Sequence, residues 1–172
     1  MKNWLKNRNI LDYVVRQGQS CDYLESHFNR SLRDKLDGDG CELLDRLIVC
    51  HKRQKQDITN IIGNIPECKV SSFYFGEMVD NNTNTMMLLS IQYVSYLRGK
   101  KRYKMLMNHE TKKNKKFIRM WQKFYVDASH NAYMTLDYIL GKWGVKVMVV
   151  IWFLMLKEQF LIRKINKHNA SR

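Results

Sequence analysis

Chain-breaking residues are scarce in this sequence, and their scarcity limits the possible folds more than any other feature. The 172 residues include one proline, Pro66, and eight glycines. A β-sandwich or β-barrel needs many tight turns, for which this chain has too few breakers. An apolar fraction of 45% with 12% aromatic residues is enough for a globular core. We therefore predict an all-α protein, a helical bundle of about six helices.

Apolar spacing and capping residues indicate where the first helices lie. A helix near the start of the chain is expected to end at Gly18, and a second follows it. Asp39 is expected to cap a third helix over residues 41–62, with Glu42 completing a capping box. The polar run 51–56 interrupts the apolar pattern of this helix, so we expect an exposed or bent segment there.

The second half of the chain also has helical spacing. A helix that begins near Asn84 is expected to continue into the lysine-rich region that follows it. Asp127 is expected to cap a short helix, and Gly141 and Gly144 to flank a joint before the last helix.

One irregular region, near residues 64–82, separates the two helical parts. It contains Pro66 and Gly76, and residues 69–75 have the β-branched and aromatic content of a short strand or β-hairpin arm. Loops of this length in compact domains often form interfaces. Phe73, Tyr74 and Phe75 are therefore candidates for a subunit contact, and the alternative is that the loop folds them onto its own core.

Positive charge is concentrated in one part of the chain. Residues 1–97 carry twelve basic and twelve acidic side chains, whereas residues 98–123 carry eleven basic and one acidic. We divide the chain into a charge-neutral helical part, 1–97, and a basic helical part, 98–172, within one compact domain plus an extension. The basic block consists of Arg98, Lys100, Lys101, Arg102, Lys104, Lys112, Lys113, Lys115, Lys116, Arg119 and Lys123.

Such a block favours a polyanionic partner. Lysine and arginine along a helix neutralise phosphates and release counterions, so unspecific contact with DNA or RNA is one interpretation. An acidic protein, an anionic membrane surface and a merely solvated face are the others. Phe117, Trp121 and Tyr125 follow at four-residue spacing, which predicts that these rings face the core instead of stacking on bases. No known nucleic-acid module is recognisable in the sequence.

The last helix contains ten consecutive apolar residues, 147–156. A membrane span needs about twenty, and extending the window brings in Lys146, Lys157 and Glu158. We therefore expect an extended apolar C-terminal helix that is buried in the bundle or at a subunit interface rather than in a membrane. The predicted interface residues in this helix are Val147, Ile151, Trp152, Phe153 and Met155.

The sequence contains no pattern typical of a catalytic or metal site. The four cysteines lack C-x-x-C spacing, and the five histidines are scattered. A calcium loop at 35–46 would begin and end on basic residues, which cannot supply its oxygen ligands. We therefore expect no catalytic residues, no metal and no cofactor. Four reduced thiols and a polar, mixed start of the chain predict a cytoplasmic location rather than secretion.

These features favour a non-catalytic structural or assembly subunit of a larger oligomeric complex. Connector- or adaptor-like components of a viral or phage particle, in the host cytoplasm or the virion, are examples of such a role. The basic block would then face nucleic acid or an acidic neighbour. The alternatives are a stand-alone, sequence-unspecific nucleic-acid-binding or regulatory protein and a membrane-associated protein.

Overall fold

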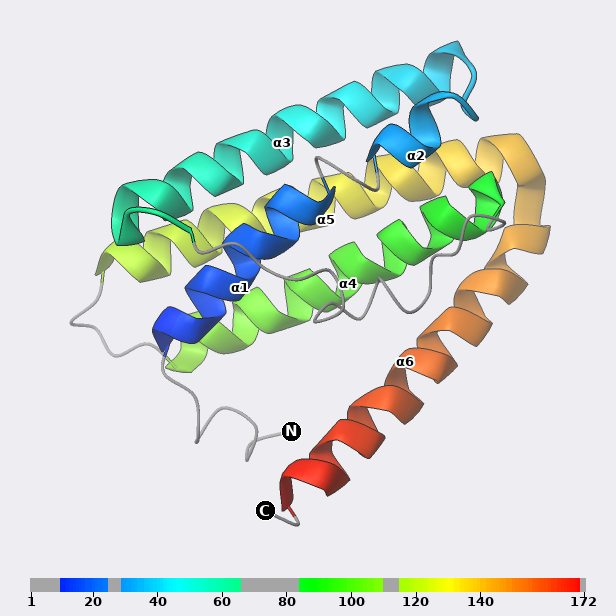
Figure 1. The fold of residues 1–172 in the computed structure, drawn as a ribbon. Coiled ribbons are helices and arrows are strands. Elements are labelled where there is room, and N and C mark those ends of the chain that lie inside the picture. The colour runs from blue at the N-terminus through cyan, green and yellow to red at the C-terminus, as the bar shows by residue number, and fades with distance from the viewer. Residues whose placement is uncertain (1–9, 25–28, 66–83, 110–114, 171–172) are drawn as a thin grey trace.

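Helices account for nearly all of the part of the chain that the structure, a computed structural model, describes (Figure 1). The described residues are 10–24, 29–65, 84–109 and 115–170, and no strand occurs among them. The predicted all-α class is therefore confirmed. The loop or hairpin expected near 64–82, with Phe73, Tyr74 and Phe75, lies almost entirely outside the described residues, as do Lys112 and Lys113 of the basic block.

The helices follow one another along the described part of the chain. They are α1 (Ile10–Tyr23), the five-residue α2 (Asn29–Arg33), α3 (Gly38–Ile62), α4 (Thr85–His109), α5 (Lys115–Trp143) and α6 (Val147–Ala170). A single 3-10 turn, η4 (Gly144–Lys146), joins α5 to α6. Gly144 has φ +65° there, a conformation that favours glycine, so the predicted joint is confirmed at this residue. Gly141 lies inside α5.

The long antiparallel pair α4 and α5 is the centre of the molecule (Figure 1). α3 packs on α5, and α1 packs across α3. α6 leaves the end of α5 and packs against α4, and its C-terminal half diverges from the bundle. Among the described helices, α6 therefore sits at the edge of the bundle, packed mainly against α4.

Of the three rings predicted to face the core, Trp121 is buried, while Phe117 and Tyr125 are half-buried against the same cluster. Trp121 and Phe124 of α5 are fully buried, and Tyr103 of α4 stacks on the Trp121 ring at a centroid distance of 5.8 Å. Ile58 of α3 and Val14 of α1 complete this part of the core. Burial of these rings stabilises the α4–α5 pair by the hydrophobic effect, and leaves the basic side chains to occupy the outer surface.

α1 does not end at Gly18, and that expectation was wrong. The helix continues through Gly18 to Tyr23. A Cβ atom at residue 18 would lie 2.6 Å from Ile65 Cδ1, well inside van der Waals contact, so a larger residue would force the Ile65 side chain to move. Gly18 therefore serves packing between two segments and does not terminate the helix.

Asp37, and not Asp39 as expected, caps α3. Its Oδ1 accepts hydrogen bonds from the Gly40 backbone N–H (2.9 Å) and from the Tyr138 hydroxyl (2.7 Å), and Lys142 donates to Oδ2. One carboxylate thus caps α3 and ties it to the last turns of α5. The Lys142 ammonium, the Tyr138 hydroxyl and the cap bond hold the pKa of Asp37 well below its usual range.

Replacing Asp37 with alanine is expected to destabilise the protein, and the loss should depend on pH. Because the pKa of Asp37 is depressed in the folded protein, the Asp37 carboxylate stabilises the fold above pH 4. This stabilisation disappears as the pH falls and the carboxylate is protonated. Thermal unfolding of wild type and Asp37→Ala should therefore differ by a few degrees at pH 7 and converge in acid. Asp39→Ala is the matched control, and an equal effect of both substitutions would contradict the assignment of the cap.

Candidate docking surface

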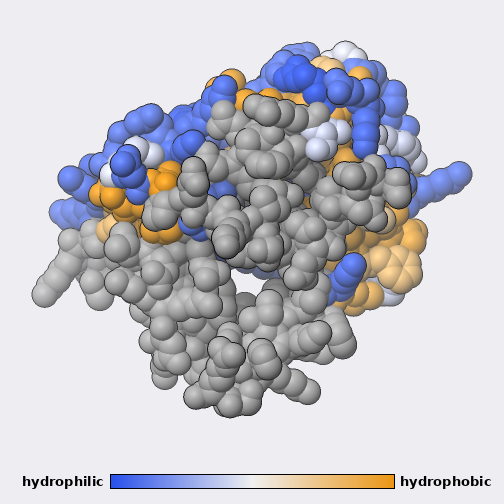
Figure 2. All heavy atoms as spheres, viewed as in Figure 1, coloured by the Kyte–Doolittle hydropathy of each residue, from blue (hydrophilic) through white to orange (hydrophobic). Residues whose placement is uncertain are grey.

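The first half of α6 buries one apolar side and exposes another. Val147, Ile151 and Leu154 pack into the core with Leu88, Leu89 and Ile91 of α4. The opposite side remains in contact with solvent, where Trp152 and Phe153 are 57% and 60% exposed. In Figure 2 hydrophobic residues gather at the edge of the molecule where α6 begins.

The exposed residues form a continuous line along the helix, which we call the apolar stripe. It consists of Val145, Met148, Val149, Trp152, Phe153 and Leu156. The spacing of three and four residues places those from Met148 to Leu156 on one side of α6, and Val145 precedes them in η4. The rings of Trp152 and Phe153 touch edge to face, at a centroid distance of 5.2 Å. Apolar patches of this kind on a protein surface mark contact sites for a partner or a membrane.

The predicted interface residues of α6 therefore divide into two groups. Val147 and Ile151 are buried in the core of the chain itself and offer no surface to a partner in this conformation. Trp152 and Phe153 belong to the apolar stripe, and Met155 is partly buried at its border. The sequence alone did not separate the two groups, because every residue from 147 to 156 is apolar and no polar face reveals which side is outward.

The same region satisfies the length and composition of a membrane span. One helical stretch, Lys115–Lys157, contains an 18-residue window apolar enough to cross a bilayer. A core helix of a soluble protein passes this test when it is buried, but only 22% of this window is buried here. The window therefore passes the composition test without being mostly buried within the described part of the chain.

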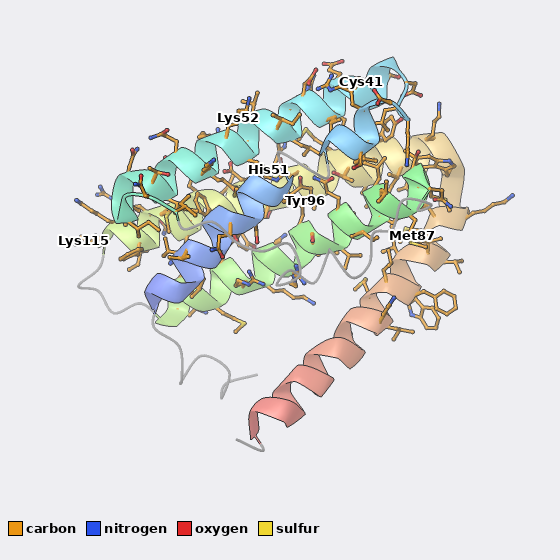
Figure 3. The ribbon with its side chains drawn as sticks, in the orientation of Figure 1. Cys41, His51, Lys52, Met87, Tyr96 and Lys115 are labelled. Carbon is orange, nitrogen blue, oxygen red and sulfur yellow. The ribbon has the colours of Figure 1, made fainter. Side chains whose placement is uncertain are left out.

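The basic block lies mainly at the opposite end of the molecule. α4 ends and α5 begins there, as the positions of Lys115 and Met87 in Figure 3 show. The exposed basic side chains of the block are Lys101, Lys104, Lys115, Lys116, Arg119 and Lys123. Arg98, Lys100 and Arg102 are half-buried.

Some of these cations have partners within the chain. Lys123 Nζ is 2.5 Å from Asp57 of α3, and the ammonium of Lys100 lies over the Tyr125 ring at 5.4 Å. No ion pair between Lys115, Lys116 or Arg119 and an acidic residue occurs among the described residues. These three side chains are exposed close together at the start of α5, and Lys101 and Lys104 of α4 are exposed as well.

A polar layer lies inside the bundle, and sequence reasoning missed it. The exposed segment expected at 51–56 is confirmed for Lys52, Arg53 and Gln56, but His51 of α3 is 98% buried and Gln54 is buried beside it. Its Nε2 is 3.2 Å from the Tyr96 hydroxyl of α4, which also accepts a hydrogen bond from Gln92 Nε2 at 2.7 Å. The His51 and Tyr96 side chains meet between α3 and α4 in Figure 3. His51 Nδ1 and Gln92 Oε1 are buried without a hydrogen-bond partner among the described residues.

Asp127 belongs to the same polar layer and does not cap a helix. α5 runs without a break from Lys115 to Trp143, so the short helix expected at Asp127 was wrong. The buried carboxylate accepts hydrogen bonds from Arg53 (2.5 Å) and from Gln54 Nε2 (3.1 Å) of α3. An aspartate in mid-helix is acceptable here because a neighbouring helix satisfies both of its oxygens.

This polar layer has the chemistry of a structural network. Burial of the imidazole lowers the pKa of His51 to about 4, so the ring is neutral at physiological pH. Burial likewise raises the pKa of the Cys50 thiol, whose Sγ accepts a hydrogen bond from Asn131 Nδ2 at 3.3 Å. A thiol with a raised pKa is a poor nucleophile. Within the described ranges, no group of three or more His, Cys, Asp or Glu is arranged to hold a metal ion.

Comparisons with known proteins found no relative of this chain. No family model matches the chain, and neither the curated proteins nor the solved structures contain a match to it.

Proposed function

We propose that this protein is a non-catalytic assembly subunit that joins a larger oligomeric complex through the apolar stripe of α6. The observation that carries the proposal is the exposure of Val149, Trp152 and Phe153 on a helix whose other face is already buried. Full burial of each such side chain by a partner would contribute about 1.5–3 kcal/mol of hydrophobic free energy. A viral or phage particle, in which connector- or adaptor-like subunits form rings, is one setting for this role.

The basic block gives the proposed subunit a second contact surface. Because Lys115, Lys116 and Arg119 lie at the start of α5, far from the stripe, one molecule can bind a neighbouring subunit and a polyanion at once. Nucleic acid or an acidic neighbour would supply the negative charge.

Light scattering after size exclusion tests the assembly role on the native protein. The proposal expects an oligomer that persists at high salt and after nuclease treatment, because an apolar contact gains strength when charges are screened. A monomer that carries nucleic acid through purification and releases it in salt would instead support the stand-alone nucleic-acid-binding protein.

Charge reversal at the start of α5 measures the role of the basic block. In Lys115→Glu/Lys116→Glu, the slope of log affinity for DNA or RNA against log salt should become smaller by about 2, because two phosphate contacts are lost. The control, Lys35→Glu/Lys52→Glu, changes the net charge equally on exposed residues elsewhere. Equal slopes for both variants would show that binding reports net charge alone.

Membrane association is a second candidate, favoured by the apolar window in Lys115–Lys157. It predicts that the protein sediments with anionic lipid vesicles and that Trp152 fluorescence shifts to the blue on binding, since the indole would enter the lipid interface. A vesicle-bound protein that is monomeric in solution would support this candidate over the assembly role.

A further inference from the structure

The spacing within the apolar stripe is that of a two-helix seam. Val145, Val149, Trp152 and Leu156 follow at intervals of four, three and four residues. This is the alternation of the a and d positions in a heptad, the pattern that packs one helix against another. Val145 lies in η4 at the start of the seam, and the other three residues lie in α6. All four are exposed, so the seam faces away from the chain's own core.

Residue sizes along the seam favour one orientation of a second copy. In a parallel pair identical residues would meet, which would bring Trp152 against Trp152 and leave Val149 opposite Val149. In an antiparallel pair centred between residues 150 and 151, Val149 lies opposite Trp152 and Val145 opposite Leu156. Each layer then combines a smaller with a larger side chain, which suits a tightly packed contact.

The residues beside the seam also suit an antiparallel pair. At its borders Met148 would lie next to Met155 of the second copy, which extends the apolar contact. Lys146 would lie next to Phe153 of the second copy, where the ammonium can contact the ring face.

We propose that residues 145–156 pair antiparallel with the same segment of a second copy of this chain, forming a two-fold symmetric dimer. A two-fold interface uses the same patch on both subunits, and the stripe is self-complementary in this register. The dimer rests on the proposed function above and specifies its partner. It would be the smallest unit of the larger assembly and would leave the two basic blocks at the outer ends.

Cysteine cross-linking tests the register directly. In the double variant Val145→Cys/Leu156→Cys, mild oxidation should convert most of the protein to a covalent dimer. Each single variant should stay uncross-linked, since identical positions lie far apart in an antiparallel pair. Eleven residues separate the two positions along the helix, about 16 Å, so one chain cannot bridge them by itself. Both positions are exposed, and wild type under the same oxidant shows the background from native cysteines.

Mixing the two single variants sharpens the test. An equimolar mixture of Val145→Cys and Leu156→Cys should yield cross-linked heterodimers, whereas either variant alone should not. Cross-linking of the single variants alone would overturn the antiparallel register. An oligomer in light scattering with no cross-link in the double variant would overturn this dimer but leave the assembly role intact. A monomer at every concentration would overturn both.

Discussion

Stability is expected to fall by about 3 kcal/mol as the pH is lowered from 6.5 to 4, because His51 is buried in its neutral form. The pKa of this histidine is lowered from 6.5 to about 4 in the folded protein, and each pKa unit corresponds to about 1.4 kcal/mol. The unfolded chain binds the proton at the ordinary pKa, so acid favours unfolding. The stabilising effect is complete above pH 6.5 and is lost as the pH approaches 4.

Denaturant titrations of wild type and His51→Gln across this pH range measure the effect. Glutamine keeps a polar group near the Tyr96 hydroxyl but does not titrate, so the variant should be less stable at pH 7 and have a flatter pH profile. Carboxylates such as Asp37 titrate in both proteins, so the difference between the profiles isolates His51. Parallel profiles would contradict the burial of a neutral imidazole in the core. His130, which is exposed on α5, offers the control substitution His130→Gln, with no expected effect.

The second large effect is expected at the apolar stripe. Replacing Trp152 with serine should raise the dissociation constant of the oligomer by about 30-fold or more, since tryptophans at the centre of an interface contribute at least about 2 kcal/mol. The same substitution should leave the thermal stability of the monomer nearly unchanged, because the side chain is largely exposed. Dilution series by light scattering give the first quantity, and circular dichroism melts give the second.

A matched substitution separates a specific contact from general surface hydrophobicity. Tyr133 of α5 is 69% exposed and lies outside the stripe, so Tyr133→Ser removes a similar aromatic surface. It is expected to leave the oligomer intact. If Tyr133→Ser weakened association as much as Trp152→Ser, the contact would not lie on α6.

Local sequence patterns correctly predicted the helical features that depend only on residues close together in the sequence. The continuation of α4 through the basic residues, the inward direction of Trp121 and the joint at Gly144 all follow from spacing and from glycine chemistry. α4 begins beside Asn84 as expected, and Asn84 caps it, since its Oδ1 accepts a hydrogen bond from the Met87 N–H at 2.8 Å. These features depend on residues within a few positions of one another.

Features that depend on a neighbouring helix were not predicted. Asp127 and His51 resemble a helix cap and an exposed turn in the sequence, but partners on other helices satisfy them. Gly18 resembles a terminator, yet α1 continues through it and Ile65 packs against it. The outward side of α6 was likewise hidden, because an all-apolar run carries no polar face that distinguishes a core from an interface. In each case the deciding contact is distant in sequence.

The mass of wild type and Trp152→Ser in solution, measured side by side at the same concentration in high salt, tests the central claim most directly. The account predicts an oligomer for wild type and a monomer for Trp152→Ser, with Tyr133→Ser behaving as wild type. Wild type that is monomeric under these conditions, or a Trp152→Ser variant with the mass of the wild-type oligomer, would contradict the assignment of the α6 stripe as the assembly surface.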